Sequence, residues 1–242
     1  MNENKHSLDL SGLGTCSGGV FNKVDISGKG KVNGNIKCSK FDASGMATVN
    51  GDITCDSFST SGMSKVKGSI DGKEIEVSGT LTVDNNTTTD LLDVSGMVKI
   101  NGNVRANEVK CEGFLKVGEG IECENIDIYG VLDSKGLINC ESINIILSAE
   151  CNCSEIGATS IVIESDDSPT SIFNFLAPRK FRRKRLYASL IEGDDIKLEN
   201  CEAKVVRGRN IKIGANCKID VIEYSESIDV DSNSKVIETN KI

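Results

Sequence analysis

Hydrophobic residues recur along this chain at a constant interval of 17 positions. One column contains Val24, Phe41, Phe58, Ile75, Leu92, Val109, Ile126 and Ile143. A second contains Ile26, Ala43, Thr60, Val77, Val94, Cys111, Ile128, Ile145 and Val162. Two more contain Val32, Val49, Val66, Val83, Ile100 and Val117, and Ile36, Ile53, Ile70, Val104, Ile121 and Ile138, with Thr87 as a polar member. Columns that share one interval indicate a repeat protein in which each repeat adopts the same structure.

Within each repeat the apolar residues alternate with polar ones, as in Val24/Ile26 and Ile36/Cys38. Alternation over a few residues is typical of short strands that bury one face. Ser-Gly and Asn-Gly steps separate the strands, and we expect them to form tight corners in left-handed backbone conformation. The glycines recur at the same interval: Gly28, Gly45, Gly62, Gly79, Gly96, Gly113 and Gly130. The pattern predicts an all-β parallel β-helix with 17-residue coils.

The repeat divides the chain into four parts. Residues 1–7 form a tail, and residues 8–164 form about nine coils, the first of which matches the second at an interval of 16. Residues 165–189 break the pattern and form a basic insertion. Paired apolar positions return in residues 190–242, where we expect two or three further coils that continue the stack or fold beside it.

Composition agrees with a narrow core. Aromatic residues make up 4% of the chain, and both prolines, Pro169 and Pro178, lie in the insertion. No basic-then-apolar leader and no apolar run of membrane-spanning length is present, so we expect a cytoplasmic protein. The net charge of −8 favours solubility and argues against nucleic acid as a partner.

The ten cysteines are interpreted as reduced core residues, as expected in the cytoplasm. Cys38, Cys55, Cys123 and Cys140 share one column with small residues. Cys151 and Cys153 form a Cys-x-Cys pair that would bind a metal only with further ligands. Because His6 is the single histidine, we predict no metal site, no cofactor and no catalytic residues.

The insertion contains a cluster of basic residues, with six of the seven residues from 179 to 185 being Lys or Arg. One interpretation is a solvated loop or a short helix that covers the stack, and another is contact with an anionic membrane or a protein partner. The residues that would make such a contact are Phe173, Phe175, Leu176, Arg179, Lys180, Phe181, Arg182, Arg183, Lys184 and Arg185.

The repeat over Phe41–Ile53 resembles the bactofilins, polymer-forming cytoskeletal proteins of bacteria. The resemblance covers roughly residues 20–145, and the segments 205–214 and 222–224 are similar to the longer, motility-linked relatives in Gram-positive bacteria. It implies a right-handed β-helix that assembles end to end into filaments without nucleotide. It further implies a scaffold role in the cytoplasm or at the inner face of the membrane, with itself or a related family member as partner.

Two other functions remain open from the sequence. A monomeric β-helix could serve as a binding module that attaches to a membrane or a protein through the insertion. A β-helix acyltransferase is disfavoured, because that class uses 18-residue coils and generally requires a histidine base in a loop, whereas His6 lies in the tail. Self-assembly into a structural scaffold is the function that the repeat and the resemblance predict.

Overall fold

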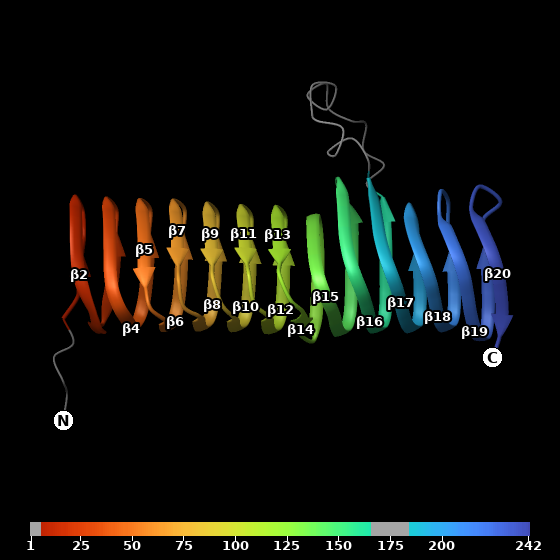
Figure 1. The fold of residues 1–242 in the computed structure, drawn as a ribbon, viewed down its shortest axis with the longest axis horizontal. Helices are drawn as coiled ribbons and strands as arrows, with labels where there is room; N and C mark the ends of the chain where they lie inside the picture. Colours follow the sequence, from red (N-terminus) through yellow and green to blue (C-terminus); the bar gives the residue numbers. More distant parts are fainter. Residues whose placement is uncertain (1–5, 166–183) are drawn as a thin grey trace, which may run out of the picture. The chain divides into compact units, whose positions relative to one another are not determined.

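The computed structural model describes residues 6–165 and 184–242, and all structural statements refer to these residues. The chain is an all-β parallel β-solenoid of about 13 turns, with coils roughly 17 residues apart (Figure 1). The predicted fold class is therefore confirmed, while the right-handed sense of the coil stays a prediction. The chain divides into two compact units, Met1–Glu119 (unit 1) and Gly120–Ile242 (unit 2), which are described separately.

Unit 1 consists of short strands joined by corners. Its strands are β1 (Leu8–Asp9), β2 (Leu13–Val20), β3 (Lys23–Ile26), β4 (Lys29–Ala43), β5 (Met46–Asn50), β6 (Ile53–Thr60), β7 (Met63–Val66), β8 (Ile70–Val77), β9 (Thr80–Val83), β10 (Thr87–Val94), β11 (Met97–Ile100), β12 (Val104–Cys111) and β13 (Phe114–Val117). Each strand pairs in parallel with its counterpart one coil further along, and β5, β7, β9 and β11 lie side by side in Figure 1.

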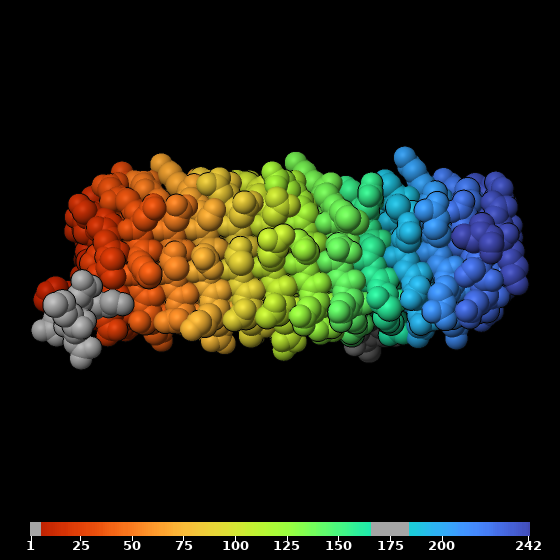
Figure 2. Space-filling view, turned by 90° about the horizontal axis from the view of Figure 1, so that it is seen from below, coloured from red at the N-terminus to blue at the C-terminus, as the bar shows by residue number. Residues whose placement is uncertain are grey.

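The register of these pairs reproduces the hydrophobic columns of the sequence. Ile36 aligns with Ile53, and Ile53 with Ile70, so that successive isoleucines stack inside the coils. Leu8 aligns with Val24, as the 16-residue first repeat predicts. The side chains of unit 1, red to yellow-green in Figure 2, lie in rows that cross successive coils. A fixed interval therefore places equivalent residues directly above one another.

The core of unit 1 is narrow and aliphatic, with one aromatic stack. Phe41 and Phe58 are fully buried, and their rings lie 4.9 Å apart between centroids at an interplanar angle of 6°. Thr60 occupies a position in which other coils have Val77 or Val94, and its hydroxyl donates to the carbonyl of Ala43. The buried polar atom is thereby satisfied, which keeps the cost of its desolvation small.

The corner glycines are required for a reason that differs from the predicted one. Among the described glycines only Gly34 has a left-handed φ, at 109°. At Gly45 and Gly62 a Cβ atom would lie 2.0 Å from the carbonyl oxygen of the corner glycine one coil earlier. The Ser-Gly corners stack so closely that no side chain fits between them, which accounts for the glycine column without positive φ angles.

Asn and Asp side chains at a second set of corners join neighbouring coils. The Asn35 carboxamide oxygen accepts from the amide of Asp52 at 2.9 Å, and the Asp52 carboxylate accepts from the amide of Ser69 at 2.8 Å. Asn86 accepts in the same way from the amide of Asn103. Each bond joins residues 17 positions apart, so these side chains fix the length of the coil as well as satisfying the corner.

Unit 2 has longer strands that bend through the corners. Its strands are β14 (Ile121–Glu122), β15 (Asn125–Leu147), β16 (Glu150–Ser165), β17 (Arg185–Leu198), β18 (Cys201–Ile213), β19 (Lys218–Val230) and β20 (Lys235–Lys241). Strands β15 to β20 pair in parallel in sequence order. The coils after the insertion therefore continue the stack of unit 2 and do not fold beside it.

The coil length varies in unit 2, and this corrects one predicted column. Ile143 aligns with Ile161 and Ile145 with Ile163, at an interval of 18. Ile161 and Ile163 are buried, whereas Val162, which the 17-residue interval placed in the core, is only partly buried. The interval is 19 from Ser134 to Cys153 and 18 from Leu137 to Glu155, and each residue beyond 17 moves the following side chains by one position along the strand.

The compact units and the sequence repeat divide the chain at different places. The boundary between the compact units falls after Glu119, inside the range 8–164 that the repeat treats as continuous. Strand β17 begins at Arg185, within the predicted insertion of 165–189. Leu186 is fully buried and aligns with Cys151 and Cys201. The basic run conceals this strand, because Lys184 and Arg185 directly precede the first core residue.

Candidate functional site

The predicted contact segment lies mostly outside the described residues. This applies to the aromatic and basic positions Phe173, Phe175, Leu176, Arg179, Lys180, Phe181, Arg182 and Arg183. Lys184 and Arg185 are described, and both are partly buried. Membrane or partner contact through this segment therefore stays a prediction, and only its final two residues can be placed.

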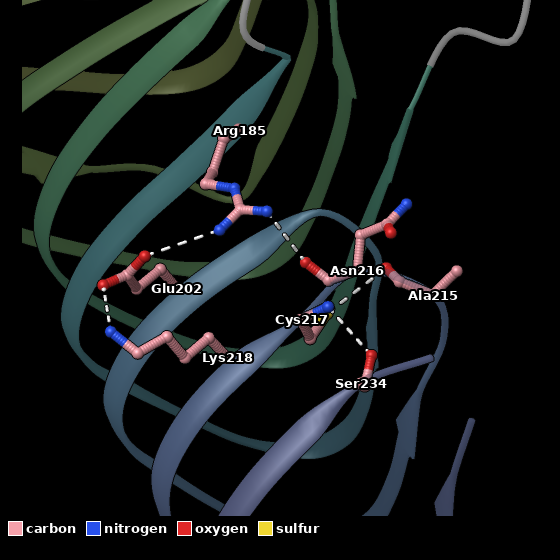
Figure 3. A network of polar contacts seen from close by, with 7 residues as sticks. All are labelled: Arg185, Glu202, Ala215, Asn216, Cys217, Lys218 and Ser234. Carbon is pink, nitrogen blue, oxygen red and sulfur yellow. Dashed lines mark hydrogen bonds and ion pairs between the residues drawn. The ribbon is translucent and has the colours of Figure 1, made fainter. Parts of the chain in front are cut away.

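Arg185 is held by two neighbouring coils (Figure 3). Its Nη1 atom lies 3.4 Å from Glu202 Oε2, and its Nη2 atom donates to the carbonyl oxygen of Asn216 at 3.2 Å. Lys218 binds the other carboxylate oxygen of Glu202 at 3.0 Å. Arg185 therefore anchors the start of β17 to β18 and to the corner before β19.

Charge at this anchor favours an ionised carboxylate. The hydrogen bond from Lys218 lowers the pKa of Glu202, and the nearby charge of Arg185 lowers it further. The corner beside them is closed by the amide of Cys217, which donates to Ser234 Oγ at 2.8 Å. The role of Arg185 that these contacts show is structural, because its guanidinium is turned to its own chain.

The cysteines occupy the core, as predicted, at most positions. All ten are free thiols, and only Cys16 and Cys123 are not fully buried. Cys38 aligns with Cys55, and the hydrogen bond between them, together with burial, raises the pKa of Cys55. Burial raises the pKa of Cys111 to about 11. The Cys55 and Cys111 thiols therefore stay protonated at neutral pH and are poor nucleophiles, whereas the hydrogen bond with Cys55 lowers the pKa of Cys38.

The Cys-x-Cys pair is part of the same core. Cys151 and Cys153 are both buried, and burial raises the pKa of Cys153 well above its ordinary value. Within residues 6–165 and 184–242, no group of three or more His, Cys, Asp and Glu residues is arranged to hold a metal ion. His6 is exposed, and none of the described residues forms a helix that would cross a membrane.

The first coil of unit 1 presents partly exposed core positions. Leu8 and Leu10 correspond to Val24 and Ile26 one coil later, which are fully buried. Cys16 likewise corresponds to the buried Val32. In the described part of the chain, β1 and β2 pair with a strand on one side only. The backbone N–H and C=O groups and the inward side chains at this edge are of the same kind as those that join one internal coil to the next.

The last coil of unit 2 presents the opposite edge. Val230 aligns with the buried Ile213 but is 37% exposed, and Val236 aligns with the buried Ile219 but is only partly buried. Thr239 is exposed at the position that follows Ile222. Among the described strands, β20 pairs only with β19. The inward side chains at this edge are therefore in position to contact a further coil.

A face of unit 1 that the sequence pattern did not single out carries exposed methionines. Met46, Met63 and Met97 each follow a corner glycine and are 40%, 55% and 52% exposed. Their 17-residue interval is visible in the sequence. The signal was missed because apolar residues at this interval were assigned to the core, whereas these methionines follow the corner and point outward.

Two curated proteins are similar to this chain over part of its sequence. Similar curated proteins include the uncharacterized proteins YhbF and YhbE of Bacillus subtilis (strain 168), which are 37% and 35% identical over 108 residues. The matched stretch covers 44% of this chain, 42% of YhbF and 44% of YhbE, so the chain spans less than half of each relative. No protein-family model and no solved structure matches the chain.

Proposed function

We propose that this chain is a structural scaffold that assembles end to end into filaments without nucleotide. The observation that carries the proposal is the similarity between the terminal edges and the internal coil junctions. Leu8 and Leu10 at one edge, and Val230 and Val236 at the other, occupy positions that are buried wherever a further coil is present.

Edge pairing supplies the energy for such assembly. A terminal coil that meets another edge forms the same ladder as an internal coil, with strands about 4.8 Å apart. It also buries the partly exposed aliphatic side chains, each worth up to about 1.5–3 kcal/mol on full burial. In solenoids, stability is approximately a sum of coil terms and nearest-neighbour interface terms, so an added copy contributes an interface of the usual kind.

The resemblance of residues 20–145 to the bactofilins supports the same function. That family builds cytoskeletal polymers, and its longer Gram-positive relatives are linked to motility. The role we propose is a cytoplasmic polymer, with the basic segment as its contact to a membrane or a partner protein. Bactofilin membership and the motility link both rest on the sequence resemblance.

Electron microscopy of the purified full chain, at neutral pH and without nucleotide, tests the proposal. We expect filaments in the wild type. Leu8→Lys and Val236→Lys place a charge at either edge, and we expect each to raise the critical concentration at least about tenfold, because a buried unpaired charge is costly. Circular dichroism of each variant establishes that the coils still form.

A matched control changes an exposed apolar residue away from the edges. Leu137 is 48% exposed, and Leu137→Lys should leave filament formation unchanged. Uniform monomers of the wild type across the concentration range would contradict the proposal and favour a monomeric binding module. Filaments that form equally well in both edge variants would show that assembly uses another surface.

A further inference from the structure

The outward side chains of β2, residues 29–33 of β4, β5, β7, β9, β11 and β13 form one face of unit 1, here called the Met–Lys face. Pairing of these strands places seven residues in one column, here called the apolar column because five of the seven are large and apolar: Leu13, Lys29, Met46, Met63, Thr80, Met97 and Phe114. Leu13 is 86% exposed. Exposed apolar side chains that gather in this way mark interaction surfaces.

A column of lysines runs beside the apolar column. Its members in coil order are Thr15, Lys31, Thr48, Lys65, Thr82, Lys99 and Lys116. Between residues 13 and 116 neither column contains an Asp or Glu, although the chain carries a net charge of −8. Lys65 lies 3.4 Å from Asp84 in the flanking column. The face is therefore locally basic on an acidic protein.

The two columns border an open groove. It has a volume of about 870 Å³ and is lined by residues that include Met46, Met63, Thr48, Lys31 and Lys65. Its lining combines apolar side chains of the first column with ammonium groups, including that of Lys29. An occupant that fits must therefore supply negative charge and an apolar part within a few ångströms of each other.

Charge complementarity decides between the occupants. Two copies that met through this face would bring lysines against lysines, which is unfavourable. Acidic side chains on another face of unit 1 are weak partners for these lysines, because Asp25 and Asp42 already pair with Lys23 and Lys40. A nucleic acid would satisfy the lysines but leave the methionines in contact with water. An anionic bilayer offers headgroups to the lysines and an apolar layer below them to Met and Leu.

We propose that the Met–Lys face docks on an anionic lipid bilayer, with the apolar column inserted at the interface and the lysines at the headgroups. This surface does not include residues 179–185, and apart from Leu13 on the first coil it lies along the side of the coils. The proposal does not depend on end-to-end assembly, and filament formation in lipid-free buffer, measured on the same samples, keeps the two questions apart.

Flotation of the full chain with vesicles tests the proposal, because bound protein rises with the lipid whereas filaments sink. Vesicles of phosphatidylcholine are compared with vesicles that contain about one third phosphatidylserine. We expect binding only to the anionic vesicles. The triple variant Lys31→Gln/Lys65→Gln/Lys99→Gln should bind roughly 100-fold more weakly, since each lysine near an anionic surface contributes about fivefold.

The matched control removes the same charge from other faces of unit 1. Lys37, Lys40 and Lys73 are exposed and lie off the Met–Lys face, and the triple variant to Gln should bind as the wild type does. A second test variant, Met46→Ser/Met63→Ser/Met97→Ser, changes no charge and should also weaken binding. Because these methionines are exposed, we expect the coils to form normally, which circular dichroism checks.

Three outcomes would overturn the proposal. The first is a wild type that does not float with anionic vesicles, which would leave an acidic protein as the occupant. The second is an equal loss of binding in the two lysine triples, which would mean that only total charge matters. The third is binding that persists in both Met–Lys variants but disappears when Arg179, Lys180, Arg182, Arg183 and Lys184 are changed to Gln.

Discussion

Units 1 and 2 hold their coils together by different means. In unit 1 the corners touch backbone to backbone, and a Cβ at Gly62 would lie 2.0 Å from the oxygen of Gly45. In unit 2 long side chains join the coils, and Arg207 binds Glu223 at 2.6 Å on one side and Glu192 at 3.2 Å on the other. Coil intervals in unit 1 are 16 or 17 residues, whereas those between β15 and β16 and from β17 to β20 range from 15 to 19.

The coil lengths follow this difference. Equivalent strands of unit 1 align at 17 residues from β4 onward, as in Ile36 with Ile53. In unit 2 the interval is 15 from Ile191 to Val206 and 16 from Val206 to Ile222. An ion pair between long side chains adjusts to a changed corner more easily than a stacked backbone does. We therefore expect unit 1 to be sensitive to steric changes and unit 2 to salt and pH.

The largest expected effect is a methyl group at a stacked corner. Gly62→Ala should lower the free energy of unfolding by roughly 2–4 kcal/mol, because the backbone of the neighbouring coil must move. Gly157→Ala is the control in unit 2, since its nearest neighbour beyond the adjacent residues would be 3.8 Å away and the change should cost less than about 1 kcal/mol. Guanidinium unfolding of both variants measures the difference, and equal losses would contradict the stacked-corner account.

The next effect is alkaline destabilisation through buried thiols. Burial raises the pKa of Cys111 to about 11, above an ordinary value of 9.0. The stabilisation is fully present below pH 9 and is lost as the pH rises through 11. The free energy of unfolding has then fallen by about 2 kcal/mol, because the thiol ionises first in the unfolded chain. Cys111→Val should remove that part of the loss, because the neighbouring coil already holds Val94 at this position. From pH 8 to about pH 11, the free energy of unfolding should fall more in the wild type than in the variant. An equal fall in both proteins would contradict the assignment to Cys111.

A buried hydroxyl in unit 1 gives a smaller effect of opposite sign. Thr87 is 1% exposed, and its Oγ1 atom has no hydrogen-bond partner among the described residues. It occupies a column in which neighbouring coils carry Ile70 and Val104. Thr87→Val should therefore raise the free energy of unfolding by about 1 kcal/mol. Thr60→Val is the control and should not stabilise, because the Thr60 hydroxyl donates to Ala43.

The smallest effect is the acid and salt response of unit 2. Lys218 and Arg185 lower the pKa of Glu202, so its stabilisation is present above about pH 4.5 and is lost as the pH falls through the lowered value. The side chain is 35% exposed and solvent screens the pair, so the contribution is below about 1 kcal/mol.

Hydrogen exchange of the intact chain locates this response. In the wild type, the protection factors near β17 and β18, which correct the exchange rates for their intrinsic dependence on pH, should fall with added salt and below pH 4.5. Both responses should be smaller in Glu202→Gln. An exchange rate near β17 that is independent of salt in both proteins would show that packing, and not charge, holds this coil.

The repeat in the sequence predicts much of this fold, for a physical reason. Strand side chains alternate with period two, so a fixed coil length brings Val24 and Phe41 to the same inward position. The prediction fails where the interval changes, as at Val162, because one added residue moves the next side chain off the core position. It also missed the Met–Lys face, since apolar periodicity alone does not distinguish an inward column from an outward one.

The corner glycines show a second limit. Their interval is evident in the sequence, but among the described glycines the explanation by left-handed φ holds only for Gly34. The actual cause is contact between coils, which depends on how closely the corners stack in space. For the candidate site, the sequence identified a basic segment, yet Arg185 at its end is bound to Glu202 and Asn216. Such long-range partners are fixed by the register of the coils.

The central claim is that copies of this chain extend one another's coil stacks. Cryo-electron microscopy of the full chain, prepared without nucleotide, tests it through the diffraction pattern of the assemblies. Coils that continue across the junction predict filaments with a strong meridional layer line at about 4.8 Å, the distance between paired strands. Monodisperse particles, or filaments without that meridional layer line, would contradict it.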